Sequence, residues 1–234
     1  MMNRRSRLGF TLAEMLLVIA IILILAALLY PVFLGARETG YASTCQNNLH
    51  QLQIAVENYA SDNTRYPPAV SVTWKDVDGN WWHRHGWVSW ADWTVEGTAT
   101  PVTPVTAPGT PHFGYSWRTG DTPNGNLCIS NGCLWTYVNK EKGVYLCPTF
   151  AQKKVCGWTD AVRSYCMNTN LDWRNLFDPG ILPSQMILFG DAKLSAAAPT
   201  KYDSVFLPPA DVAKYHRTAR GNVVYLDGHV ERMQ

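Results

Sequence analysis

The sequence lacks the motifs that mark the commonest catalytic and nucleotide-binding sites. Its 234 residues contain no G-x-S-x-G nucleophile segment and no P-loop glycine pattern. They also contain no C-x-x-C pair, the usual signature of zinc, thiol-redox and haem-attachment sites. We therefore expect no enzyme activity, no catalytic residues, no cofactor and no metal ligands.

The sequence also has little excess charge of either sign. Lys and Arg number 20 against 18 Asp and Glu, a formal net charge of +2, and three of the arginines lie within the first seven residues. Long-range attraction to nucleic acid requires a basic surface, so we expect no nucleic-acid partner. No fixed-period repeat is present, and the chain is long enough to bury one core.

One long apolar run is present, from Phe10 to Leu29. As a helix it would be about 30 Å long, which matches the hydrocarbon core of a bilayer. A carboxylate inside such a span costs on the order of 2.5 to 3.5 kcal/mol, so Glu14 is expected to have a partner. A hydrated carboxylate near the helix end is the alternative. The arginines before the run predict a cytoplasmic amino terminus.

The residues around the start of this run indicate how the chain is processed. A secretory signal peptide has small residues at its cleavage site, whereas this run ends in Leu-Leu-Tyr-Pro. The segment RLGFTLAE instead resembles the processing site of type IV prepilins and type II secretion pseudopilins. The resemblance implies that a membrane peptidase cuts between Gly9 and Phe10 and methylates the new amine of Phe10. The mature chain then has 17 basic and 18 acidic residues.

The same resemblance implies roles for two further residues and a set of partners. Glu14 would neutralise the Phe10 amine of a neighbouring subunit during assembly, and Pro31 would bend the helix. The expected partners are other pilin-like subunits, the prepilin peptidase and methylase, the membrane, and an inner-membrane assembly platform with a separate ATPase.

The segment after the run predicts an amphipathic continuation of the helix. Its apolar residues recur at spacings of four and three along one face, which should lie on a sheet: Cys45, Leu49, Leu52, Val56 and Tyr59. Gly35 and Gly40 weaken the middle of the helix, and Asp62 and Asn63, followed by two prolines, end it.

We expect four segments along the chain: a cytoplasmic leader at 1–9, a transmembrane and filament-core helix at 10–30, its amphipathic continuation at 31–64, and an exported head at 65–234. In the head, short apolar runs separated by turn residues predict antiparallel strands. The fold class is therefore α+β and pilin-like, with a long amino-terminal helix packed on an antiparallel sheet. The stretch near 94–111 is rich in Thr, Pro and Gly and predicts an exposed variable loop.

The carboxyl-terminal segment HRTARGNVVYLDGHVERM resembles the prepilin-associated region in which nine residues separate a histidine from Asp-Gly. Ten residues separate His216 from Asp227 and Gly228 here, which leaves a special role for His216 open. With His229 these side chains could form a metal or catalytic site, but a two-residue hairpin turn at Asp227 and Gly228 is favoured.

The segment DVDGN presents alternating oxygen ligands at Asp76, Asp78 and Asn80. Its glycine is misplaced for a calcium-binding EF-hand loop, so a hairpin tip is favoured over a calcium site.

Six cysteines on the outer side of a membrane favour disulfides, because that compartment is oxidising. Cys128 and Cys133 flank a turn and form the best local pair, although fifteen connectivities are open. The resemblance implies a bond from the helix to the head, Cys45–Cys147, and this leaves Cys156 to pair with Cys166. A small buried thiol is the alternative for Cys45.

Seven of the ten tryptophans lie between Trp74 and Trp117. Aromatic side chains of this size favour core and cross-strand packing. The alternative is an exposed binding face for sugar or protein, with these candidates: Trp81, Trp82, Trp87 and Trp90.

Together these patterns predict a structural subunit of a type IV pilus or a type II secretion pseudopilus. It would be stored in the cytoplasmic membrane with a single span and an exported head, and then drawn into a cell-surface or periplasmic filament. The alternative is an adhesin or carbohydrate-binding protein displayed on the same anchor.

Overall fold

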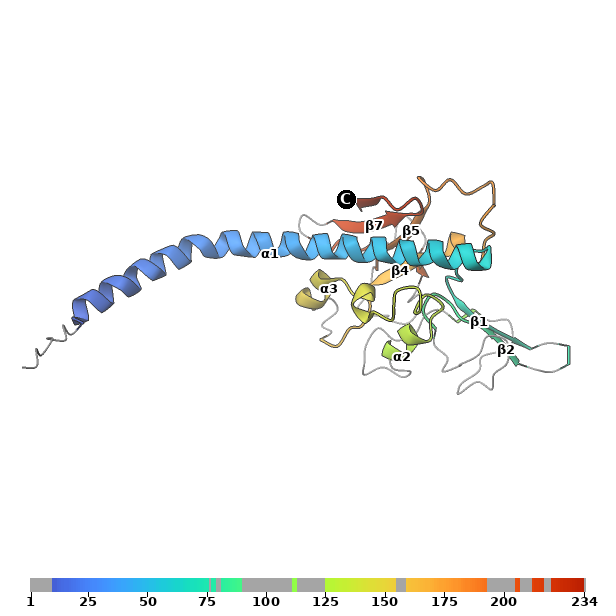
Figure 1. The fold of residues 1–234 in the computed structure, drawn as a ribbon, viewed down its shortest axis with the longest axis horizontal. Helices are drawn as coiled ribbons and strands as arrows, with labels where there is room; N and C mark the ends of the chain where they lie inside the picture. The colour runs from blue at the N-terminus through green and yellow to red at the C-terminus, as the bar shows by residue number, and fades with distance from the viewer. Residues whose placement is uncertain are drawn as a thin grey trace, which may run out of the picture. The chain divides into compact units, whose positions relative to one another are not determined.

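The computed structural model describes residues 10–75, 77–78, 81–89, 111–112, 125–154, 159–192, 205–206, 212–216 and 220–233. The chain forms two compact units, Met1–Gly40 and Tyr41–Gln234, which correspond to an apolar helical segment and a head (Figure 1). Gly9 and the rest of the expected leader lie outside the described residues, as does most of the expected variable loop.

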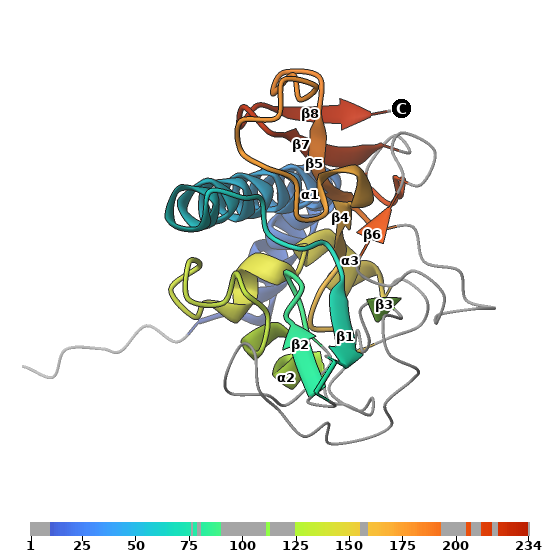
Figure 2. The ribbon, with the colours of Figure 1, turned by 90° about the vertical axis from the view of Figure 1, so that its right-hand side faces the viewer.

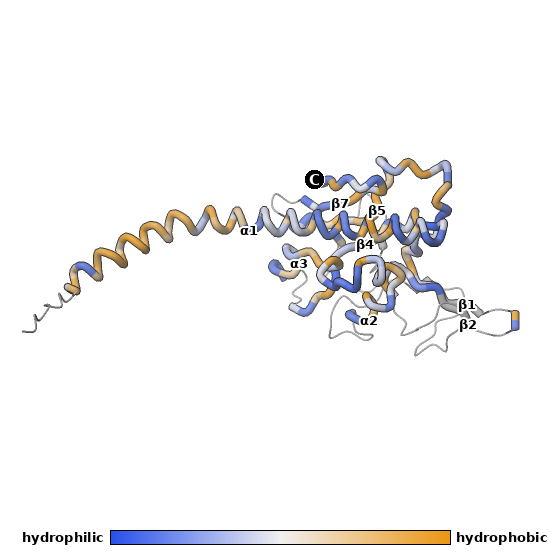
Figure 3. Tube along the Cα trace, in the orientation of Figure 1, coloured by the Kyte–Doolittle hydropathy of each residue, from blue (hydrophilic) through white to orange (hydrophobic). Residues whose placement is uncertain are grey.

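Helix α1 (Leu12–Asn63) begins in the first unit. Its first part is mostly apolar, as the largely orange tube with a short blue stretch near its start in Figure 3 shows, and it has the length and composition of a membrane span. A helix with this pattern has no single face that one protein core could cover. The chain is therefore membrane-anchored through this segment.

The part of α1 that lies in the second unit is amphipathic, as predicted. All five residues of the expected stripe, Cys45 to Tyr59 at spacings of four and three, are buried. The helix ends at Asn63, whose side-chain amide donates to the Tyr59 carbonyl at 2.9 Å, and Thr64 follows with a left-handed φ of 57°. The prediction of a helix that ends at Asp62 and Asn63 is confirmed.

A five-stranded sheet forms the centre of the head, with the order β6-β4-β5-β7-β8 (Figure 2). Its strands are β4 (Tyr165–Asn168), β5 (Ile187–Asp191), β6 (Val205–Phe206), β7 (Gly221–Tyr225) and β8 (Val230–Met233). The pairs are antiparallel except for β4 with β6, which is parallel. The expected α+β arrangement is confirmed, with one parallel strand at an edge.

The core of the head joins the amphipathic part of α1 to this sheet. Leu49 and Val56 of the helix belong to the same buried cluster as Leu188 and Phe189 of β5. Every residue of β4 and β5 is buried, so these two strands are covered on both faces. Continuous apolar runs such as MILFG are typical of strands in that position.

Smaller elements complete the described part of the head. They are β1 (Ser71–Lys75), β2 (Trp81–Arg84), β3 (Pro111–His112), α2 (Gly125–Ser130), the 3-10 helix η1 (Lys142–Tyr145), α3 (Pro148–Lys153) and the 3-10 helix η3 (Thr169–Leu171). Lys75 of β1 pairs with Trp81 of β2. The DVDGN segment therefore connects two strands of a hairpin, as favoured over a calcium loop.

The hairpin between β7 and β8 differs from its prediction by one residue. Tyr225 pairs with His229 through its N–H, which donates to the His229 carbonyl at 2.9 Å, and the Gly228 N–H donates to the Tyr225 carbonyl at 3.0 Å. The loop therefore contains three residues, Leu226 to Gly228, rather than two. Gly228 has a φ of +91°, the conformation that the last position of a three-residue hairpin loop requires.

Candidate functional site

The start of α1 is closed by a reciprocal pair of side-chain caps. The Thr11 hydroxyl lies 3.3 Å from the Glu14 N–H, which donates to it, and the Glu14 carboxylate accepts from the Thr11 N–H at 2.8 Å and from the Thr11 hydroxyl at 2.7 Å. This is a capping box, which satisfies helix N–H groups that have no partner in the helix. The sequence signal T-x-x-E was present, but the two interpretations given for Glu14, pairing between subunits and a hydrated carboxylate, did not include a cap.

The side chains that follow this cap are exposed within the described chain. Phe10 is 71% exposed, and the large apolar residues from Leu12 to Leu34 are between 42% and 78% exposed. Pro31 lies inside the helix, whose assignment continues through it, and the Thr39 hydroxyl donates to the Gly35 carbonyl at 3.1 Å. The bend at Pro31 stays a prediction.

The head contains a buried cluster of four side chains that can each ligate a metal. Cys45 comes from α1, Cys147 precedes α3, Asp191 ends β5, and His216 lies in the segment before β7. One donor atom from each lies within 4.8 Å of all the others. His216 Nε2 is 3.1 Å from an Asp191 oxygen and 3.6 Å from Cys147 Sγ, and Cys45 Sγ is 3.5 Å from the other Asp191 oxygen.

A ring of hydrogen-bond donors surrounds this cluster. The Asn222 backbone N–H donates to Asp191 at 2.6 Å, and the Tyr215 hydroxyl donates to the other oxygen of the same carboxylate. The Tyr165 hydroxyl and the Asn222 side-chain amide each donate to Cys45 Sγ at 3.2 Å. The Asp191 carboxylate and the Cys45 sulfur are thus held by donors from β4, β7 and the segment before β7.

The cluster perturbs the titration of its members. Burial raises the pKa of the Cys45 thiol well above its usual range. Burial acts in the same direction on Cys147, but hydrogen bonds with Cys45 and His216 outweigh it and lower the pKa of Cys147 to about 6. Burial alone would lower the pKa of His216, whereas the hydrogen bonds with Asp191 and Cys147 raise that pKa to about 9. The contact between Cys147 and His216 therefore lowers the pKa of the thiol and raises that of the imidazole.

The backbone around His216 is placed by close packing. The His216 N–H donates to the Arg220 carbonyl at 3.1 Å, and the Ala213 N–H donates to the Asp191 carbonyl at 2.8 Å. A Cβ at Gly221 would lie 2.1 Å from the Ala213 carbonyl oxygen, so only glycine allows the two segments to approach this closely. This packing carries His216 to the end of β5.

The structure separates the residues that the carboxyl-terminal motif had grouped. His216 is buried and contacts Asp191. Asp227 is exposed at the β7–β8 turn, where its carboxylate accepts from the backbone N–H of His229 and contacts the Nδ1 atom of the same residue. The suggested site of His216, Asp227 and His229 is therefore wrong. Asp227 shapes the turn and Gly228 supplies its positive φ. The side-chain partners of His216 are instead Asp191, Cys147 and Asn222, none of which the sequence motif had grouped with it.

No disulfide joins two of the five described cysteines in this structure. Cys45 and Cys147 are brought together in the buried cluster, as a bond from helix to head requires, but their thiols are unbonded. The Cys133 N–H donates to the Gly86 carbonyl and the Ser89 N–H donates to the Cys128 carbonyl, and a bond between Cys128 and Cys133 stays a prediction. Cys156 lies outside the described residues, so its pairing with Cys166 stays a prediction.

Two family models match the chain. A prokaryotic N-terminal methylation motif matches residues 4–30, and a family described as a protein of unknown function (DUF1559) matches residues 35–127. The type II secretion system core protein G of Klebsiella michiganensis and that of Aeromonas hydrophila are each 38% identical over 66 residues. That of Dickeya chrysanthemi has the same identity over the same length.

These matches support a type IV pilin-like protein, with the methylation motif at the start of its long helix. The 66 residues are 28% of this chain and 46%, 46% and 42% of the three relatives, so the chain spans less than half the length of the curated relatives it matches. No solved structure matches the chain. The methylation motif lies on the apolar helical segment, and the DUF1559 match extends into the head.

The described tryptophan of the candidate binding face is a core residue of this pilin-like head. Trp87 is fully buried, stacks on Tyr145 at 6.0 Å between ring centroids, and meets Phe189 edge-on at 4.9 Å. For Trp87 the favoured prediction of core packing is therefore confirmed over the alternative of a binding face, because its ring contacts Tyr145 of η1 and Phe189 of β5. The side chains of Trp81 and Trp82, and the whole of Trp90, lie outside the described part.

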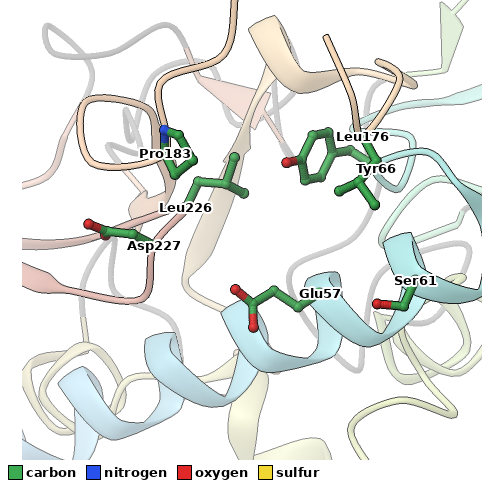
Figure 4. Close-up of a pocket in the computed structure, with 7 residues that line it drawn as sticks. All are labelled: Glu57, Ser61, Tyr66, Leu176, Pro183, Leu226 and Asp227. Atoms are coloured by element: carbon green, nitrogen blue, oxygen red, sulfur yellow. The ribbon is translucent and has the colours of Figure 1, made fainter. Parts of the chain in front are cut away.

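One pocket of about 280 Å³ opens on the head between α1 and the β7–β8 turn. Figure 4 shows Glu57 and Ser61 on the helix side, with Asp227 on the opposite wall. Burial and the Glu57 carboxylate raise the pKa of Tyr66, which lines the same pocket. Its lining includes two carboxylates, those of Glu57 and Asp227.

Proposed function

We propose that the protein is a structural subunit of a type IV pilus or a type II secretion pseudopilus. It would be made as a membrane-anchored prepilin with a cytoplasmic amino terminus, cleaved after Gly9, methylated on Phe10 and assembled through α1. The observation that carries this proposal is the Thr11–Glu14 capping box at the head of a helix whose apolar residues are exposed all round.

The geometry of the cap suggests how Glu14 acts in a single subunit and in a filament. Both hydrogen bonds from Thr11 end on Oε2 of Glu14. The carboxylate therefore stays hydrogen-bonded while the subunit waits in the membrane, and Oε1 is placed to accept from the Phe10 amine of a neighbour. Pairing in a medium of low dielectric is strong, and an unpaired carboxylate there is costly, so correct registration of two helices is favoured.

The remaining contact between subunits would be apolar. Side chains such as Leu16, Ile22 and Leu29 are more than half exposed in the single chain. In the membrane they face lipid, and in a filament they would pack against α1 of other pilin-like subunits. The peptidase, the methylase, the assembly platform and its ATPase are the further partners that this route requires, and the protein itself would have no catalytic role.

Three variants separate charge pairing from capping. Glu14→Gln keeps a side chain that can complete a capping box but removes the charge, Glu14→Ala removes both, and Thr11→Ala removes the threonine cap and keeps the charge. We expect leader removal and membrane insertion in all three. Filament content, measured by immunoblot of sheared or periplasmic filaments, should be lost in both Glu14 variants and largely kept in Thr11→Ala.

Gly9→Val is the matched control for processing, because it should block leader removal itself. Wild-type filament content for Glu14→Gln, in a filament where this chain is the main subunit, would contradict the pairing. Loss in Thr11→Ala equal to that in Glu14→Gln would show that the cap, and not the charge, is what assembly needs.

The alternative of a displayed adhesin or carbohydrate-binding protein has no support from the described residues. It depended on a face of exposed tryptophans, and Trp87 at its centre is buried.

A further inference from the structure

We propose that Cys45, Cys147, Asp191 and His216 form a tetrahedral zinc site in the core of the head. The proposal uses none of the residues proposed for assembly, and it does not depend on which filament contains the subunit.

The spacing of the donor atoms fits such an ion. Zinc binds sulfur at about 2.3 Å and nitrogen or oxygen at about 2.0 to 2.2 Å, so the edges of a tetrahedral site are roughly 3.3 to 3.8 Å long. The described separations are 3.1 Å from His216 Nε2 to Asp191 Oδ2 and 3.6 Å from Cys147 Sγ to His216 Nε2, with Cys45 Sγ 3.5 Å from the other Asp191 oxygen, Oδ1. Since all four donors lie within 4.8 Å of one another, small side-chain adjustments would bring them onto one ion.

The donor set selects the metal. Two thiolates, one imidazole and one carboxylate are the ligand types of zinc, whereas calcium and magnesium take oxygen ligands. All four ligands come from the protein and are at least 94% buried, so no position is open to water or substrate. A closed site of this kind is structural rather than catalytic.

Hydrogen bonding alone does not satisfy the crowded centre of the cluster. His216 Nε2 has three polar neighbours, namely Asp191 at 3.1 Å, Cys147 at 3.6 Å and the Asn222 side chain at 2.8 Å. An imidazole nitrogen has only one proton or one lone pair in the ring plane, so it can satisfy only one of them. A cation at the centre would accept the Nε2 lone pair, the carboxylate oxygen and the sulfur together.

The surrounding donors are placed as an outer layer of a metal site should be. Tyr215 and the Asn222 backbone hold the Asp191 carboxylate, while Tyr165 and the Asn222 side chain donate to Cys45 Sγ. Hydrogen bonds of this kind orient ligands and stabilise thiolate and carboxylate charge in metal sites. With an ion on His216 Nε2, the Asn222 amide would give up its contact with that nitrogen and keep its hydrogen bond to Cys45 Sγ.

Two other uses of the cluster explain less of it. A Cys45–Cys147 disulfide would use the two sulfurs but would give Asp191 and His216 no reason to converge on the same point. A thiol nucleophile at Cys147 with His216 as its base requires access for a substrate, and Cys147 is 0% exposed.

The proposed ion would join parts of the head that are far apart in the sequence. It would tie α1 to the end of β5, to the start of α3 and to the segment before β7. Because the ligands are at positions 45, 147, 191 and 216, no short-range spacing such as C-x-x-C could reveal the site.

The first test needs no mutation. The full-length mature chain is purified in detergent with a reducing agent and without a metal-binding tag, and its zinc is measured by elemental mass spectrometry. We expect about one zinc per chain, a lower Tm after chelation that added zinc restores, and a cobalt-substituted form with thiolate-to-metal charge-transfer absorption. A metal-free chain that also takes up no added zinc, or a Cys45–Cys147 disulfide in protein isolated from the cell envelope with alkylated thiols, overturns the proposal.

Variants then assign the ligands. Cys45→Ser and His216→Gln should lose stoichiometric zinc, while Cys166→Ser, which changes another buried cysteine, and His229→Gln, which changes an exposed histidine, should keep it. Tyr215→Phe removes only the hydroxyl that donates to Asp191 and should weaken zinc affinity on the order of 10- to 100-fold. If a ligand variant does not fold, the zinc affinity of Tyr215→Phe and the cobalt spectrum of the wild type test whether the zinc site exists. Unchanged affinity in Tyr215→Phe together with a cobalt spectrum free of thiolate bands counts against the site.

Discussion

The two halves of α1 differ in how much apolar surface they have and in what covers it. In the first half Leu29 is 65% exposed, whereas in the second half Leu49 is 0% exposed and belongs to the core of the head. The first half is apolar on all sides, and the second half has a single stripe with polar residues opposite. An apolar surface on all sides of a helix must be covered by lipid or by other chains, whereas a single apolar stripe can be covered by the head of the same chain.

The largest expected effect concerns the head alone. Trp87→Ala should lower the free energy of unfolding of the head by about 3 to 5 kcal/mol, as truncation of a buried aromatic does, because the ring contacts both Tyr145 and Phe189. Urea unfolding of the mature chain in detergent, followed by near-UV circular dichroism, measures the change.

The matched control is Phe177→Ala, since Phe177 is 79% exposed and its loss should change stability by no more than about 0.5 kcal/mol. Leader removal should be normal in both. A Trp87→Ala head as stable as the control would mean that the ring is not part of the core.

The difference between the halves of α1 can be tested by making the same substitution, leucine to alanine, once in each half. Leu49→Ala should cost the head about 2 to 5 kcal/mol, with assembly impaired only as far as folding is. Leu29→Ala should leave the urea midpoint of the head unchanged and reduce filament content instead. If Leu29→Ala destabilised the head as much as Leu49→Ala does, the account of an outward-facing first half would be wrong.

The smallest expected effects come from two glycines. Gly228→Ala should cost about 1 to 2 kcal/mol, since an alanine in left-handed backbone is strained, and its Cβ would lie 3.2 Å from the Gln53 amide oxygen. Gly40→Ala should favour the helix by about 0.5 to 1 kcal/mol, because a Cβ there meets nothing within 4 Å. Urea unfolding measures the effect of Gly228→Ala, and helix content by circular dichroism measures that of Gly40→Ala. A stabilised head in Gly228→Ala, or a lower helix content in Gly40→Ala, would contradict the difference between the two sites.

Local patterns predicted the elements that local physics controls. The spacing from Cys45 to Tyr59 predicted the buried face of α1, and the residues after Tyr59 predicted its end. The Asp227-Gly228 pair predicted a turn but not its length, because the register of β7 with β8 decides whether two or three residues are left over.

Contacts that join distant segments could not be predicted in the same way. Nothing in the sequence near His216 indicates that Asp191 lies 3.1 Å away or that Cys147 is its other neighbour. Those contacts depend on how β5 and the segment before β7 are placed by the whole sheet. The capping box at Thr11 and Glu14 is the opposite case, because its T-x-x-E signal is local and could have been predicted from the sequence.

The most direct test of assembly through the first half of α1 is the chemical state of the amino terminus in assembled protein. Filaments are sheared or released, and the amino-terminal peptide of this chain is identified by tandem mass spectrometry. The account predicts that the assembled chain begins at Phe10 with a methylated amine. Assembled protein that retains residues 1–9, or that begins at any other residue, would contradict it.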